Sequence, residues 1–211
     1  MPDLDFRVED AAMLPYAAAP SLLFRLRVAN ASAEPVRSIM LGSQIRIAPT
    51  LRHYTPAEQE ALVELFGEPA RWRETLKSLL WTHATVLVPG FMESTLVDMA
   101  VPCTYDFEVA SAKYFAALED GAVPLEFLFS GTVFYAGADG LRAEQLSWEK
   151  EARYGLPVQV WQETMEHYFP QSAWLRVRRE TFDRLYRYKA QHSLPTWDDA
   201  LERLLRAASE D

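Results

Sequence analysis

The sequence has few of the residues that mark disulfide-stapled, membrane-spanning or nucleotide-binding proteins. Cys103 is the only cysteine in 211 residues, which excludes a disulfide framework within the chain. No apolar run reaches the roughly 18 to 20 residues that a membrane-spanning helix needs. The eight glycines include no Gly-x-Gly arrangement, so the dinucleotide fingerprint and the Walker phosphate loop are both missing. The N-terminus lacks the basic segment of a secretory signal peptide, and we therefore expect a soluble cytoplasmic protein.

The residues that usually carry metal or covalent chemistry are scarce and scattered. The four histidines never fall within five residues of one another, whereas zinc and di-iron sites usually contain a close ligand pair. No Gly-x-Ser-x-Gly elbow is present, and Cys103 lies among apolar residues, where a lone cysteine usually serves as a small hydrophobic side chain. The sequence therefore predicts no catalytic residue, no metal site and no cofactor. The alternative is an enzyme whose site is assembled from distant residues such as His83, His167 and Asp106.

What is present is the composition of a folded, acidic protein with one basic segment. Hydrophobic residues make up 49% of the chain and charged residues 24%, which excludes general disorder. The net charge is −9, yet the segment 174–190 holds six bases against two acids. A basic patch on an acidic body suits an acidic partner, although these arginines could instead pair with the protein's own carboxylates. The candidate partner-binding residues are Arg176, Arg178, Arg179, Arg184 and Arg187.

Alternating apolar and polar residues predict β-strands through most of the first 150 residues. The alternation is clear at 4–8, 22–28 and 39–47, and it returns at 82–88, 95–101, 105–109 and 125–135. Because the connections between these runs are short, the neighbouring strands should be antiparallel. The predicted fold class is α+β, with an antiparallel sheet or an immunoglobulin-like sandwich, in which Tyr105 could be a corner tyrosine.

Helices are predicted within and after these strands. Thr55-Pro-Ala-Glu58 has the form of a capping box, and a second helix would carry Trp72, Leu76, Leu79 and Leu80, so a two-helix insertion is expected at 55–81. A third helix is expected from Ser111 to Asp120. The predicted domains are an antiparallel β domain at 1–154 and a C-terminal helical region at 155–211.

The C-terminal region combines a possible short strand with two helices. Trp174 to Arg178 alternates like a strand, Phe182 and Tyr186 share a helical face, and Thr196-Trp-Asp-Asp199 predicts a capping box that starts the last helix. The stretch 174–205 resembles the strand-helix-helix unit of ribbon-helix-helix repressors, whose strands enter the major groove. That resemblance implies an alternative function in nucleic-acid binding, with Arg176 and Arg178 reaching the DNA.

Several runs along the whole chain resemble an uncharacterised bacterial family of unknown function. The runs are Leu22-Leu-Phe-Arg-Leu-Arg-Val28, Gln44-Ile-Arg-Ile47, Leu65-Phe-Gly-Glu-Pro69, Pro102-Cys-Thr-Tyr-Asp106, Lys113-Tyr-Phe115, Phe129-Ser-Gly-Thr-Val-Phe134 and Leu194-Pro-Thr-Trp-Asp-Asp199. Genes of that family tend to lie beside genes of nickel-iron hydrogenases, so the resemblance implies an accessory or assembly role. The stretch 113–134 is also similar to part of the bacterial export chaperone, which is an antiparallel sheet backed by helices.

These observations favour a non-catalytic accessory or assembly protein that binds a protein partner. Catalytic signatures are missing, and the 6 Trp, 9 Tyr and 11 Phe are residue types that favour protein interfaces as well as cores. The family resemblance makes a hydrogenase subunit or assembly factor the expected partner. We expect no membrane partner, and the oligomeric state stays open.

Overall fold

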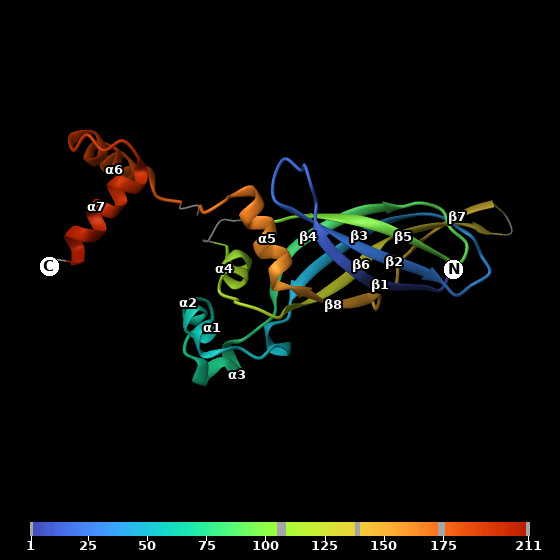
Figure 1. Cartoon of the computed structure of the whole chain (residues 1–211). Coiled ribbons are helices and arrows are strands. Elements are labelled where there is room, and N and C mark those ends of the chain that lie inside the picture. The colour runs from blue at the N-terminus through green and yellow to red at the C-terminus, as the bar shows by residue number, and fades with distance from the viewer. Residues whose placement is uncertain (1, 105–108, 138–139, 173–175, 210–211) are drawn as a thin grey trace. The chain divides into compact units, whose positions relative to one another are not determined.

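The computed structural model describes residues 2–104, 109–137, 140–172 and 176–209 (Figure 1). Its contacts divide the chain into two compact units, Met1–Trp174 and Leu175–Asp211. The first unit contains two antiparallel sheets and a set of short helices, which confirms the α+β prediction with a sandwich-like arrangement. No helix in the described ranges has the length and apolar character needed to cross a membrane.

The smaller sheet has three strands in the order β1-β2-β5. These strands are β1 (Leu4–Met13), β2 (Ser21–Asn30) and β5 (Ser94–Pro102). The alternation seen in the sequence becomes alternation of burial, because Leu4, Phe6 and Val8 are buried while the intervening residues of β1 are exposed. This sheet therefore turns one apolar face inward, as the sequence predicts.

The larger sheet has five strands and is organised around its longest strand. Its members are β3 (Val36–Ile47), β4 (Leu79–Val88), β6 (Ala122–Gly137), β7 (Gly140–Gln145) and β8 (Glu151–Pro157). One edge of β6 is bonded to β3, and the other is shared, with β8 along its first half and β7 along its second half. β3 in turn pairs with β4, so the path runs β4-β3-β6-β7.

Aromatic side chains from the two sheets meet in the core. Phe24 on β2 is fully buried, and its ring centroid lies 5.3 Å from that of Phe127 on β6. Phe6 on β1 stacks on Phe129 of β6 at 4.6 Å. Burial of one such side chain stabilises the fold by about 1.5 to 3 kcal/mol, so these contacts hold the two layers of the sandwich together.

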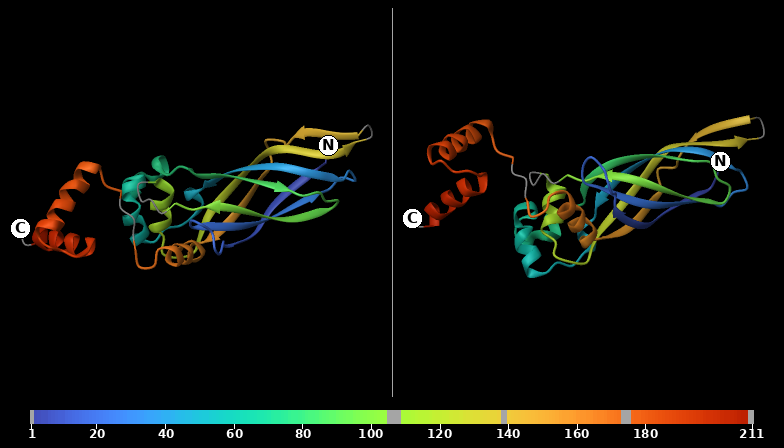
Figure 2. Two further views of the ribbon diagram at one scale, coloured as in Figure 1. Left: turned by 90° about the horizontal axis from the view of Figure 1, so that it is seen from above. Right: turned by 45° about the horizontal axis from the view of Figure 1, so that its top comes forward.

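Short helices cover one end of the sandwich. They are α1 (Pro56–Ala61), α2 (Val63–Phe66), α3 (Trp72–Thr75) and α4 (Ala110–Ala116), with 3-10 turns at Pro49–Leu51 and Pro69–Arg71. The predicted capping box is confirmed, because the Glu58 amide donates to Thr55 Oγ1 at 3.2 Å and the Thr55 amide donates to Glu58 Oε2 at 3.0 Å. Figure 2 shows this helical end and the β6–β7 hairpin at opposite ends of the strands.

The predicted second helix of the insertion at 55–81 is too long. Leu79 and Leu80 belong to β4, where they pair with Ile47 and Arg46. The spacing of these leucines is compatible with a helix and with a strand. The strand forms because pairing with β3 satisfies the backbone hydrogen bonds of this segment. The predicted strand at 105–109 and its corner tyrosine Tyr105 fall largely outside the described residues.

Helix α5 (Val158–Tyr168) is part of the first unit. Trp161 is 4% exposed and stacks on Phe115 of α4 at 5.3 Å. Tyr168 Oη donates to the Leu14 carbonyl at 3.2 Å. These contacts attach α5 to the sandwich, so the first compact unit extends to residue 174. The division predicted from the sequence lies between residues 154 and 155.

The second unit contains α6 (Arg179–Gln191) and α7 (Trp197–Ser209). The predicted capping box at the start of α7 is confirmed, since the Asp199 amide donates to Thr196 Oγ1 at 3.0 Å and the Thr196 amide donates to Asp199 Oδ2 at 3.1 Å. The strand predicted at 174–178 does not form in its described part, because residues 176–178 have no strand partner. Trp174 and Leu175 lie outside the described residues.

Candidate functional site

A buried ion pair organises the helical end of the sandwich. Arg52 Nη2 lies 2.5 Å from Glu58 Oε1, and the Glu58 side chain is 1% exposed. The same carboxylate accepts from the Glu119 amide at 3.1 Å, while Arg52 also donates to the carbonyls of Asp120 and Ala122 at 2.5 and 2.9 Å. This one arginine therefore joins the segment before α1 to the segment between α4 and β6.

The environment of Glu58 keeps its carboxyl group charged. Burial by itself would raise the pKa of Glu58. Hydrogen bonds from the Thr55 and Glu119 amides and from Arg52, together with the charge of Arg52, outweigh burial and lower the pKa below its usual value. These partners come from the segment before α1, from its N-cap and from the segment after α4, so the charge of Glu58 links these segments.

Aromatic residues pack beside the ion pair. The hydroxyls of Tyr54 and Tyr114 lie 2.7 Å apart, and Tyr54 also donates to the Pro49 carbonyl at 2.8 Å. Phe66 and Trp72 pack edge-on against this pair, at 6.2 Å from Tyr114 and 5.2 Å from Tyr54. These four rings extend the hydrophobic core of the sandwich into the helical end.

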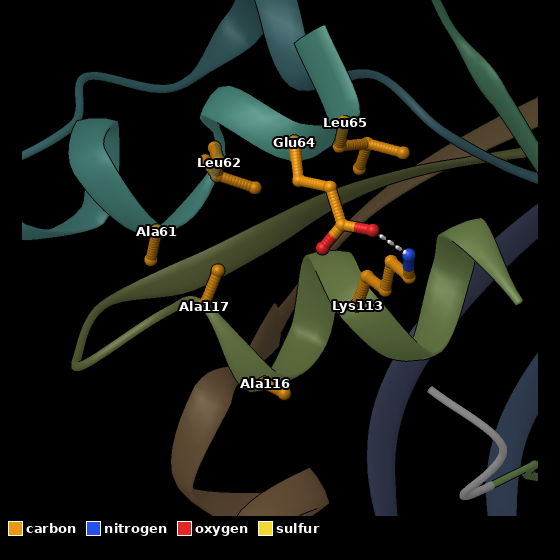
Figure 3. Close-up of a pocket in the computed structure, with 7 residues that line it drawn as sticks. All are labelled: Ala61, Leu62, Glu64, Leu65, Lys113, Ala116 and Ala117. Atoms are coloured by element: carbon orange, nitrogen blue, oxygen red, sulfur yellow. Dashed lines mark hydrogen bonds and ion pairs between the residues drawn. The ribbon is translucent and has the colours of Figure 1, made fainter. Parts of the chain in front are cut away.

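A groove lies between the α1–α2 segment and α4, with a volume of about 380 Å³ (Figure 3). We call it the α4 groove, and it is lined by Ala61, Leu62, Glu64, Leu65, Lys113, Ala116 and Ala117. Glu64 and Lys113 point toward each other across it and form an ion pair. The lining consists of three alanines, two leucines and one charged pair, and the amine of Lys113 is held in its ion pair with Glu64.

The residues proposed for a dispersed active site do not form a visible cluster. His83 on β4 and His167 on α5 are both exposed, and Asp106 lies outside the described residues. Across the described parts of the chain, no three His, Cys, Asp or Glu side chains are grouped closely enough to hold a metal ion. Cys103 is 8% exposed, and burial raises the pKa of its thiol to about 12, which keeps it protonated and unreactive.

An exposed aromatic cluster is the most distinctive feature of the second unit. We call it the ring cluster: Phe182 and Tyr186 on α6, and Trp197 at the start of α7, with ring centroids 5.4 to 6.3 Å apart. The three residues are 39%, 59% and 37% exposed. Lys189 Nζ lies 5.8 Å from the Trp197 ring, which places a positive charge beside the cluster.

The arginines proposed from the sequence fall into three settings. Arg179 forms an ion pair with Asp183 at 3.1 Å. Arg184 and Arg187 line one shallow hollow of about 280 Å³, with Tyr188 and Gln191. Arg176 and Arg178 precede α6 and lie outside regular structure.

Arg184 and the rings occupy different sides of α6, whereas Arg179 lies on the same side as the rings. Phe182 and Tyr186 are four residues apart and share a face, whereas Arg184 lies two residues from each and points away from that face. The sequence predicts that Phe182 and Tyr186 share a helical face, and it leaves open whether the rings belong to the core or to an interface. Trp197, which lies within the predicted capping box of α7, is the sequence feature that could have indicated that the rings gather at the junction of the two helices.

Comparison with known proteins places the chain in a family. A family described as "Family of unknown function (DUF6084)" matches residues 1–211. The chain belongs to this family. No curated protein matches the sequence.

Solved structures share only parts of the architecture. A late embryogenesis abundant (LEA) protein is 13% identical, with 74% of this chain and 73% of that chain covered and a TM-score of 0.35. The ApaA protein from Bordetella pertussis is 11% identical, with coverage of 74% and 93% and a TM-score of 0.27. The β-glucosidase 3B from Thermotoga neapolitana is 13% identical, with coverage of 73% and 17% and a TM-score of 0.26. These values are too low to support an inference about function.

Proposed function

We propose that the protein is a non-catalytic accessory or assembly protein that binds a protein partner through the ring cluster. The supporting observation is the exposure of three aromatic rings in a unit where Ala200 is the only buried residue among 176–209. Exposed apolar patches often mark interaction sites, and Trp and Tyr are enriched among the residues that dominate binding energy.

The charges around the ring cluster indicate what kind of surface would fit it. Lys189 flanks the rings, and the segment 175–211 carries eight Arg and Lys against seven Asp and Glu, while the whole chain has a net charge of −9. An apolar surface with acidic groups at its rim would contact the rings and Lys189 together. Arg184 and Arg187 lie on the other side of α6 and would contribute to the rate of encounter more than to the contact itself.

We further propose that the partner is a nickel-iron hydrogenase subunit or an assembly factor of that enzyme in the bacterial cytoplasm. The support for this step is the resemblance of the sequence to a family whose genes tend to lie beside hydrogenase genes. This resemblance supports only the class of partner. The ring cluster as the binding surface is supported separately, by the exposure of its rings.

Affinity purification of the full chain from native cells tests both steps. We expect wild type to recover one partner reproducibly, and Tyr186→Ala with Trp197→Ala to lose it. Tyr16→Ala is the matched control, because Tyr16 is fully exposed in the first unit and its removal should leave recovery unchanged. Recovery of a partner that both variants retain would reject the ring cluster, and a partner unrelated to hydrogenase would reject only the second step.

Nucleic-acid binding is the second candidate function, favoured by the exposed arginines of α6 and the residues before it. A gel shift at low salt tests it, with Arg176→Glu plus Arg178→Glu as the variant. Phosphate contacts would make wild-type binding strong at low salt and weak at high salt. If neither protein shifts the probe, this candidate is rejected.

A further inference from the structure

β7 forms an open edge of the larger sheet. It pairs with β6 alone, through a register that runs from Gly137↔Gly140 to Thr132↔Gln145. All six residues of β7 are exposed or half-exposed, and no strand in the described part of the chain borders its other side. Protein edges are usually protected by proline, a bulge or charged side chains; β7 has no proline or bulge, and its only charged residues are Arg142 and Glu144.

The hydrogen-bond pattern shows which backbone groups β7 presents to the outside. The Leu146 amide donates to the Gly131 carbonyl at 2.8 Å, so residue 146 faces β6. In an antiparallel pair the direction of the backbone N–H and C=O groups alternates from one residue to the next. The backbone groups of Arg142 and Glu144 therefore also face β6. Leu141, Ala143 and Gln145 therefore direct their N–H and C=O groups outward, as three donors and three acceptors without a strand partner.

The charges of β7 are self-complementary about Ala143, because a positive residue lies on one side of it and a negative residue on the other. Arg142 and Glu144 flank this residue, and both side chains lie on the face of the sheet that carries Tyr135. In an antiparallel pair of two β7 strands centred on Ala143, Arg142 of each copy lies opposite Glu144 of the other. We propose that a second copy of this chain is the partner of the β7 edge, in a two-fold symmetric dimer with this register.

The register brings the opposite charges to the closest positions of the ladder. Ala143 would bond to Ala143 of the second copy, and Leu141 to Gln145, which gives six backbone hydrogen bonds. The intervening pairs, Arg142 with Glu144 of the second copy, are then the non-hydrogen-bonded pairs, whose side chains approach most closely. Tyr135 Oη donates to Glu144 Oε1 at 2.6 Å and orients this carboxylate, which has further acceptor positions for the incoming arginine.

The alternative registers lose this complementarity. A pairing centred on Leu141 places Gly140 opposite Arg142, and a pairing centred on Gln145 places Leu146 opposite Glu144. The proposed register also brings together the outer-face residues Leu141, which is 70% exposed, and Ala143 from both copies. A self-complementary strand fits a two-fold axis, which makes a second copy a better occupant than a strand of another protein.

Sedimentation equilibrium of the full chain in the micromolar range tests the dimer, which does not rest on the proposed function. We expect wild type to dimerise, and Arg142→Glu or Glu144→Arg to weaken the dimer on the order of tenfold or more, because each creates two like-charge pairs. The double variant R142E/E144R should restore dimerisation, since it exchanges the charges and keeps the pairing. Ala143→Pro should give a monomer, because it removes two outward N–H donors and no bond to β6.

Thermal melting followed by circular dichroism separates loss of pairing from loss of fold. Ala143→Pro and R142E should melt close to wild type, so that a monomer observed for them reports on the edge. A wild type that stays monomeric across the micromolar range overturns the proposal. So does a dimer that persists in both Ala143→Pro and R142E.

Discussion

Arg52 and Glu58 form an ion pair that is almost fully enclosed by the helical end of the sandwich, with Nη2 and Oε1 2.5 Å apart. The pair connects two loops that are far apart in the sequence, because Arg52 also donates to the carbonyls of Asp120 and Ala122. Removing one member of such a pair leaves the other charge buried without a counterion. The stability of this end of the molecule should therefore depend on the charge of Glu58.

Glu58→Gln should lower the free energy of unfolding at neutral pH by about 3 kcal/mol, in the range observed when a buried pair is broken. The pKa of Glu58 is lowered in the folded state, so its contribution is fully present above the unfolded-state value of about 4.3 and is lost as the pH falls toward the folded-state value. The difference between wild type and variant should thus shrink in acid. Urea unfolding from neutral to acidic pH measures it.

Glu60→Gln is the matched control, because Glu60 lies in the same helix and is exposed. Its effect should stay within about 0.5 kcal/mol at every pH. Equal losses for both variants would contradict a specific role of the ion pair.

The tyrosine pair should respond asymmetrically to loss of its hydroxyls. Tyr54→Phe leaves the fully buried Tyr114 hydroxyl without its partner, and this should cost about 1 to 3 kcal/mol. Tyr114→Phe leaves Tyr54 bonded to the Pro49 carbonyl, so it should cost about 1 kcal/mol or less. Denaturant unfolding of the two variants tests the order, and the reverse order would show that Tyr114 has another partner.

Gly131→Ala should disrupt the centre of the larger sheet. A methyl group at this position would lie 2.0 Å from the Met40 carbonyl oxygen of β3, and the residue has φ +150°. Because the obstacle is backbone, relief requires separating β6 from β3, and we expect a loss above about 4 kcal/mol or no folded protein. Gly67→Ala is the control, since it has φ +73° with nothing within 4 Å and should lose about 1 to 2 kcal/mol.

Thr196→Ala should loosen the start of α7. It removes the side-chain oxygen that accepts from the Asp199 amide, which should cost about 1 kcal/mol. Hydrogen exchange of the first-turn amides of α7 should accelerate, while exchange in β6 stays unchanged. Thr196→Ser keeps the acceptor and should exchange like wild type; acceleration in both variants would rule out the cap as the cause.

Local patterns predict much of this fold because they depend on neighbouring residues. The alternation at Leu4, Phe6 and Val8 specifies the buried face of β1, and the motifs at Thr55 and Thr196 specify two helix starts. These features are set by the period of the strand and by hydrogen bonds within one turn.

Features that depend on distant contacts were missed. Leu79 and Leu80 continue a helical spacing, yet pairing with β3 determines their structure. No spacing marks Arg52 as a buried residue, because its partners Asp120 and Ala122 are remote in the sequence. The position of α5 on the first unit likewise depends on contacts of Trp161 and Tyr168 with distant segments.

The three-way pairing of β6 also orders the events of synthesis. β3 and β4 leave the ribosome before β6 exists, and a two-stranded ribbon is only marginally stable in water. Until β6 arrives, the edge of β3 that bonds to it keeps its backbone N–H and C=O groups without a strand partner. During that interval the nascent chain has an unpaired strand edge, and its yield in the cell should depend on how quickly translation passes residue 137 or on a chaperone that shields the edge of β3 meanwhile.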